Sequence, residues 1–153
     1  MQLSAEGLDL IKKFEGFRDR VYLDVAGFPT IGYGHLIKLH ESFPNGITEP
    51  QAAAILATDV QDAEQSVARL VKVVLTQGQF DALVDFCFNL GAARLASSTL
   101  LRELNLGDYQ AACEQLLAWD HAGGVVVTGL KARRQAELQL WTGASGATQT
   151  VAA

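Results

Sequence analysis

The sequence predicts an α+β fold in which a small antiparallel sheet is separate from a larger set of helices. Three observations favour this class. Apolar residues recur at helical spacing near both ends of the chain, and β-forming residues interrupted by glycines lie between positions 17 and 37. The length of 153 residues suits one domain, or two small lobes, with a sizeable core.

The first expected helix begins after Ser4, a favourable N-cap residue, and ends near Glu15. Gly16 suits the position that follows a helix, where a left-handed conformation is common. The apolar stripe of this helix consists of Leu8, Ile11 and Phe14.

The segment from Phe17 to about Ile37 predicts a small antiparallel hairpin. Val21–Leu23 are strand formers, and a second strand begins near Thr30. Pro29 lacks an amide N–H and therefore suits the start or edge of a strand. We expect a third short strand near residues 36–39.

A long helix is predicted from Glu49 to Leu70. Thr48 is its expected N-cap, with Pro50 in the first turn and Gln51 at the third position. Its apolar stripe is thin, which is typical of a helix that bridges two lobes. The predicted domain therefore covers residues 1–142: a small lobe at about 14–48, a linking helix at about 49–70, and a helical lobe at about 71–142 together with the N-terminal helix.

The rest of the chain predicts further helices. Thr76 and Gln79 repeat the capping signature before an apolar helix that Gly91 ends. Shorter segments follow: helices at about Ser98–Leu104 and Tyr109–Ala118, a loop or small hairpin at Gly123–Gly129, and a last helix at Leu130–Trp141. Residues 143–153 are small and polar, so we expect a flexible tail.

Composition excludes several classes of function. The net charge of -5 argues against a nucleic-acid partner, which requires a basic face. No histidines or cysteines stand at metal-ligand spacing, so neither a metal nor a cofactor is expected. Cys87 and Cys113 lie on the apolar faces of predicted helices, where buried thiols are expected, although a disulfide between them stays open. Without a signal peptide or a long apolar run, we expect a soluble cytosolic chain without stable membrane association.

Three residues are candidates for chemistry. Glu15 lies at the negative end of the first helix and between Phe14 and Phe17, and both features favour a protonated carboxyl group. Asp24 enters a turn, and Thr30 lies across the hairpin from it. Taken locally, each has an ordinary alternative: a solvated helix end, a turn aspartate and a β-forming threonine.

The spacing of these residues resembles that of a known family. Eight residues separate Glu15 from Asp24 and five separate Asp24 from Thr30, as in the phage-type lysozymes, the T4-like endolysin and muramidase family (glycoside hydrolase family 24). Further similar segments extend the resemblance from Leu3 to Trp141; they are Gly27–His35, Ala82–Gly91, Ser98–Leu101, Leu106–Tyr109 and Gly129–Glu137.

The resemblance implies a lysozyme-like fold and hydrolysis of the β-1,4 bond between N-acetylmuramic acid and N-acetylglucosamine in peptidoglycan. Glu15 would donate the proton, Asp24 would support the developing positive charge or help to activate water, and Thr30 would hold that water. Leu36 and Phe88 match positions near the saccharide cleft, although ordinary core packing is an equal alternative for Phe88. The resemblance also implies accumulation in the host cytoplasm and release through a holin-type pore, and we expect the protein to be a monomer.

Two further matters depend on the structure. His35 is expected to pair with a buried acid rather than to act in catalysis. Arg133 and Arg134 are neighbours on a helix and point in different directions, so at most one should approach Glu15.

Other functions stay open at this stage. An inactive wall-binding or scaffold module with the same fold, a chitinase and a lytic transglycosylase are the alternatives. The acidic net charge also fits poorly with an anionic cell wall. Whether the reaction inverts or retains configuration depends on the distance between the carboxyl groups, which a sequence does not give.

Overall fold

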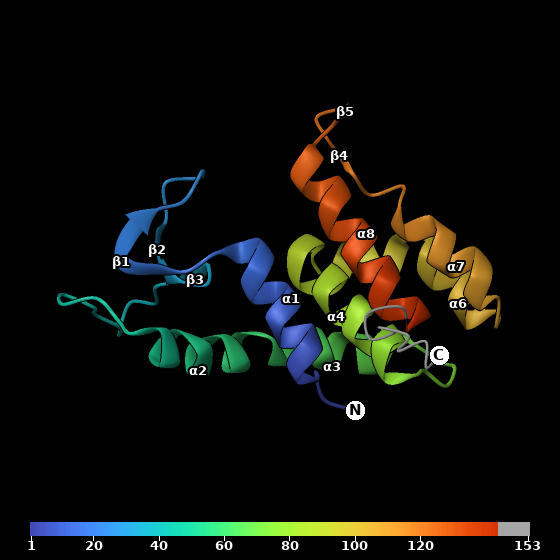
Figure 1. Ribbon diagram of the computed structural model, residues 1–153, viewed down its shortest axis with the longest axis horizontal. Coiled ribbons are helices and arrows are strands. Elements are labelled where there is room, and N and C mark those ends of the chain that lie inside the picture. The colour runs from blue at the N-terminus through green and yellow to red at the C-terminus, as the bar shows by residue number, and fades with distance from the viewer. Residues whose placement is uncertain (144–153) are drawn as a thin grey trace, which may run out of the picture.

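The computed structural model describes residues 1–143, so the predicted tail lies, except for Gly143, outside the described residues. The described chain forms two lobes beside each other (Figure 1). The smaller lobe contains β1 (Arg18–Leu23), β2 (Pro29–Gly32), β3 (His35–Leu36) and α2 (Glu49–Asp59). The larger contains α3 (Gln61–Leu70), α4 (Gln77–Leu90), α5 (Ala92–Ser97), α6 (Thr99–Asn105), α7 (Tyr109–Leu116), β4 (His121–Ala122), β5 (Val125–Val126) and α8 (Thr128–Thr142). The predicted α+β class, with a small antiparallel sheet and a larger helical lobe, is confirmed.

The helix α1 (Ala5–Glu15) lies between the lobes and contributes to both cores. Leu10 belongs to the cluster of the large lobe, and the next residue, Ile11, belongs to that of the small lobe. Ser4 caps the helix by accepting from the amide of Gly7, as predicted. Because α1 packs into both cores, its C-terminal end lies at the junction of the two lobes.

The small sheet has the order β1-β2-β3, with both pairs antiparallel. Pro29 begins β2, the position that its missing N–H allows. The third strand comprises His35 and Leu36 instead of the expected residues 36–39. It ends early because Lys38 begins a turn, which the amide of Glu41 closes by bonding to the Lys38 carbonyl.

The segment from Glu49 to Leu70 is two helices in succession, so the prediction of one continuous helix is wrong. The capping box at Thr48 and Gln51 is present and begins α2 as expected. Val60 then has a ψ of -16°, which turns the backbone away from ideal α-helical geometry before α3 begins. The side chain of Val60 is buried in the small-lobe core, so tertiary packing holds this break.

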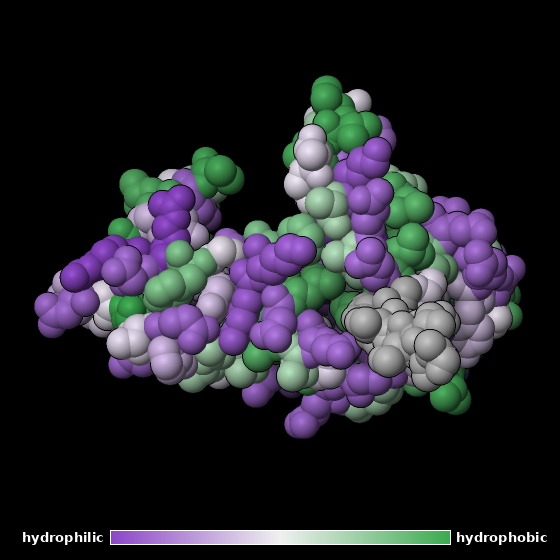
Figure 2. Space-filling model, viewed as in Figure 1, coloured by the Kyte–Doolittle hydropathy of each residue, from purple (hydrophilic) through white to green (hydrophobic). Residues whose placement is uncertain are grey.

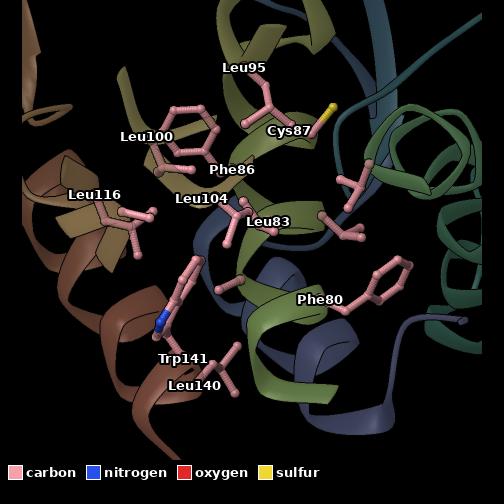
Figure 3. Close-up of a cluster of buried hydrophobic side chains, with 14 of the residues drawn as sticks. Phe80, Leu83, Phe86, Cys87, Leu95, Leu100, Leu104, Leu116, Leu140 and Trp141 are labelled. Carbon is pink, nitrogen blue, oxygen red and sulfur yellow. The ribbon is translucent and has the colours of Figure 1, made fainter. Parts of the chain in front are cut away.

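The helix α4 lies at the centre of the large lobe (Figure 3). Its residues Phe80, Leu83 and Phe86 are 2% exposed or less, and α8 packs against it through Leu140 and Trp141. The helix α5 was not predicted, because six residues without a side-chain cap give a weak periodic signal. The expected loop or hairpin near Gly123 is a short two-stranded hairpin, β4–β5.

Candidate active site

Glu15 is the last residue of α1, and the space-filling view shows a wide notch above this part of the molecule (Figure 2). The small sheet lies on one side of the notch and the β4–β5 hairpin on the other. The Glu15 side chain is 24% exposed, so it is partly withdrawn from solvent but still accessible. A methyl group on Gly34 would lie 3.2 Å from Glu15 Oε2. The carboxylate therefore lies against the turn between β2 and β3.

The other oxygen of Glu15 is held by an arginine from the far end of the chain. Nη1 of Arg133 in α8 donates to Oε1 of Glu15 at 2.8 Å. Burial opposes the charge of Arg133, but hydrogen bonds to Asp85 and Glu15 more than offset it and raise the pKa of the guanidinium. Arg134 instead donates to Asn89. The expectation that at most one of the two arginines approaches Glu15 is thus confirmed.

Asp24 follows β1 and organises the turn to β2. Its Oδ1 accepts from the amides of Ala26 and Phe28, each at 2.9 Å. These bonds occupy one carboxylate oxygen and leave Oδ2 outside the turn network. Asp24 therefore stabilises the turn, which is the ordinary role that its local sequence suggested. Its second carboxylate oxygen is still available for another contact.

Thr30 is buried in β2 and pairs with Tyr22 in β1. Thr30 lies across the hairpin from Asp24, as expected, although the residue that faces Asp24 is Phe28, whose carbonyl accepts from the amide of Asp24. That same carbonyl accepts from Thr30 Oγ1 at 2.9 Å. Asp24 and Thr30 are thus held to one peptide group and kept in a fixed relationship.

The two expected saccharide contacts differ in their environment. Leu36 is 54% exposed and pairs with Thr30 in the sheet. Phe88 is partly buried and packs against the cores of both lobes. The packing of Phe88 agrees with the core alternative, whereas Leu36 is free to meet a ligand.

His35 is buried between two carboxylates. Its Nδ1 lies 2.7 Å from Asp59, and its Nε2 lies 2.8 Å from Glu41. Because each carboxylate is an acceptor, only the doubly protonated ring satisfies both contacts. The histidine is paired as expected, but both acids are partly exposed instead of buried.

Two acidic residues beneath Arg133 were not predicted. Asp85 and Glu137 are both fully buried, and the carboxylate of Asp85 accepts two hydrogen bonds from the guanidinium of Arg133. A signal was present in the sequence, because an aspartate within the apolar run of α4 is a residue type that is almost never buried without a partner.

No group of three or more histidines, cysteines or acids that could hold a metal is found within residues 1–143. Within the same residues, no helix has both the length and the apolar character to cross a membrane. Cys87 and Cys113 are both buried and free, which agrees with the expected buried thiols.

This fold, with a glutamate at the junction of a small sheet lobe and a helical lobe, defines the class of lysozyme-like proteins. The family model described as phage lysozyme matches residues 12–137. The chain is 39% identical over 148 residues to the endolysin of Acyrthosiphon pisum secondary endosymbiont phage 1, and the match covers 94% of this chain and 100% of the relative. The chain belongs to the phage lysozyme family.

A solved structure and a second relative agree. A mutant of P22 lysozyme has a TM-score of 0.85 and 39% identity, with 93% of this chain and 99% of that chain covered. The endolysin of Bacillus phage B103 is 44% identical over 144 residues, which is 92% of this chain. The chain spans only 54% of that relative, so the activity of the whole B103 protein does not transfer without a test.

Proposed function

We propose that this protein is a muramidase (EC 3.2.1.17) that hydrolyses the β-1,4 bond between N-acetylmuramic acid and N-acetylglucosamine in bacterial peptidoglycan. Glu15 is the proton donor, Asp24 supports the developing positive charge, and Thr30 holds the attacking water. The observation that carries the proposal is the position of Glu15 Oε2 close to Gly34, because Gly34 lies in the turn that joins β2 to β3. Thr30 belongs to β2, and Asp24 lies in the turn that leads into β2.

The contacts of Glu15 define how it delivers the proton. Arg133 donates to Oε1, so this oxygen acts as an acceptor in either protonation state. The transferable proton therefore resides on Oε2, the oxygen that faces Gly34. Arg133 fixes the orientation of the acid, which reduces the entropy that must be lost in reaching the transition state.

Several finer properties belong to the same proposal. The enzyme is a T4-like member of glycoside hydrolase family 24, needs no cofactor or metal, acts as a monomer, and binds saccharide through Leu36 and Phe88. Its domain covers residues 1–142, with the small lobe at 14–48, the linking segment at 49–70 and the helical lobe at 71–142. It accumulates in the host cytoplasm without stable membrane association and reaches the wall by holin-type release. Expression with and without a holin, followed by culture turbidity, tests the release route.

The replacement of Glu15 by glutamine tests the reaction. Glu15→Gln keeps the size and the acceptor for Arg133 but removes the acid, so the turnover of purified cell walls should fall by about 100- to 10,000-fold. Glu6→Gln is the matched control, because Glu6 is an exposed carboxylate on the same helix. Equal activity of Glu15→Gln and wild type would remove Glu15 from catalysis.

The products identify the reaction class. Simple hydrolysis gives muropeptides with reducing ends, whereas a lytic transglycosylase gives anhydro-muramic ends, so mass analysis of the released fragments separates the two. If the protein cleaves chitin but releases no fragments from peptidoglycan, then chitin and not peptidoglycan is its substrate. A wild-type protein that binds walls but releases no fragments would support the scaffold alternative.

A further inference from the structure

Five charged side chains meet where α4, α8 and α1 converge. Arg133, Arg134 and Glu137 come from α8, Asp85 from α4 and Glu15 from α1. All except Glu15 are at most 4% exposed. If every group were ionised, three carboxylates would face two guanidinium groups, and burial makes an unbalanced charge expensive.

Asp85 determines how Arg133 is oriented. Nε of Arg133 donates to Oδ2 of Asp85 at 2.9 Å, and Nη2 donates to Oδ1 at 2.7 Å. This fork occupies one edge of the planar guanidinium. Nη1 remains for Glu15. The direction of the donor that reaches Glu15 is therefore set by Asp85.

Glu137 has one cationic neighbour but no well-formed hydrogen bond among the described residues. Its Oε1 lies 2.8 Å from Nη2 of Arg134, but within the described chain neither Glu137 oxygen forms a hydrogen bond of acceptable geometry. A protonated Glu137 is itself a donor, and Asp85, which binds the neighbouring Arg133, is the acceptor that we assign to it. Burial, followed by the hydrogen bond and charge of Asp85, raises the pKa of Glu137 well above its usual range.

Other charged groups near this cluster are engaged elsewhere. Asp81, one turn earlier on α4, accepts from Ser4 and Gln77. Glu114, the charged residue of α7, accepts from Gln110. Asp85, Arg133 and Arg134 are therefore the charges that act on Glu137, and Glu15 acts through Arg133.

We propose that Asp85 and Glu137 are positioning residues: Asp85 stays ionised, Glu137 stays protonated and donates to it, and together they aim Arg133 at Glu15. The cluster then contains two cations and the anion of Asp85, and Glu15 contributes the second anion, which balances the charge, once it has donated its proton. This assignment rests on the proposed function for its catalytic consequence, but the protonation of Glu137 is a property of the folded protein alone.

The first test measures unfolding free energy against pH for wild type and Glu137→Gln, whose amide copies the protonated acid. An acid whose pKa is raised by folding binds more protons in the folded state, so wild type loses stability as pH rises above the unfolded value of about 4.3. The folding equilibrium constant of Glu137→Gln, divided by that of wild type, should therefore rise by up to tenfold per pH unit between about 4.3 and the raised pKa of folded Glu137. A difference between the two proteins that does not change with pH overturns the assignment.

The second test uses Asp85→Asn, which removes the anion beneath Arg133. We expect kcat to fall by about 10- to 100-fold with KM within about twofold, because misplacement of a catalytic group affects the chemical step. The pH values at which kcat falls on the acidic and alkaline sides should also shift. Asp85→Glu, which keeps the carboxylate, should restore part of kcat. Unchanged kcat and an unchanged pH profile in folded Asp85→Asn would overturn the positioning role.

One measurement separates this proposal from the proposed function. The NMR signal of the Arg133 Nε–H reports its bond to Asp85 and should be protected from exchange in wild type. If wild type does not hydrolyse walls, the proposed function fails, but the Arg133 signal and the Glu137→Gln series still decide this assignment. Rapid exchange of Nε–H in folded wild type contradicts it.

Discussion

Nη1 of Arg133 donates to Oε1 of Glu15 at 2.8 Å, although the two residues are 118 positions apart in the chain. This contact joins the last helix to the end of the first at the junction of the lobes. It requires the large lobe to be folded before the environment of Glu15 is complete. The acid is therefore a product of the tertiary structure and not of its own helix.

Replacing Arg133 by methionine should be strongly destabilising. The change leaves the carboxylate of Asp85 fully buried without its cation, which costs about 3 to 5 kcal/mol in unfolding free energy. Chemical denaturation measures this loss. The double variant Arg133→Met with Asp85→Asn removes both charges and should be more stable than Arg133→Met alone; strictly additive losses would contradict the ion pair.

Local signals in the sequence predicted the starts of helices well. Ser4, Thr48 and Thr76 were expected as caps, and each accepts the expected backbone amide, because a cap and its donor are only three residues apart. The break at Val60 was missed because it depends on packing in the small-lobe core. Local sequence does not record such a contact.

The candidate site followed a similar division. Helix geometry alone predicted that the side chains of Arg133 and Arg134 point in different directions, and in the structure they bind Glu15 and Asn89, respectively. The identity of the arginine that meets Glu15, and the role of Asp85, needed the relative placement of three helices. Residues that are distant in sequence are brought together by packing, so periodicity alone could not reveal this network.

Gly78 should be intolerant of substitution. A Cβ atom at this position would lie 2.0 Å from the carbonyl oxygen of Leu140, so α4 and α8 would have to separate. We expect Gly78→Ala to lower the unfolding free energy by about 3 kcal/mol or more. Gly129→Ala is the control, because Gly129 lies in α8 with open space around it, and alanine should stabilise a helix there by about 0.5 to 1 kcal/mol. Equal effects of the two changes on the melting temperature would show that α4 and α8 are not in this contact.

Cys87 and Cys113 should behave as inert thiols. Both are buried and free, and burial raises the pKa of each, which lowers the fraction of reactive thiolate. A reductant should therefore leave the melting temperature unchanged. Mass spectrometry after alkylation should show little labelling of the native protein and two labels after unfolding. A native mass lower by two hydrogens would instead indicate a disulfide.

The His35 cluster should make stability depend on pH near neutrality. Burial opposes the charged ring, but the hydrogen bonds to Glu41 and Asp59 outweigh this and raise the pKa of His35. The folded state therefore binds the proton more tightly than the unfolded state, whose value is about 6.5. The resulting stabilisation is complete below that value and is lost as pH rises through the raised pKa of folded His35.

Replacing His35 by glutamine checks this dependence. The variant should be less stable than wild type by about 2 kcal/mol at pH 6, because it loses charge-assisted hydrogen bonds, and the gap should narrow as pH rises. At the acid end, the backbone of Lys38 and then the ring of His35 lower the pKa of Glu41, so this contact persists until pH falls below the usual carboxyl range. His40→Gln is the control, since His40 is exposed. Denaturation at several pH values measures the gap, and a constant gap between His35→Gln and wild type would mean that His35 is neutral in the folded protein.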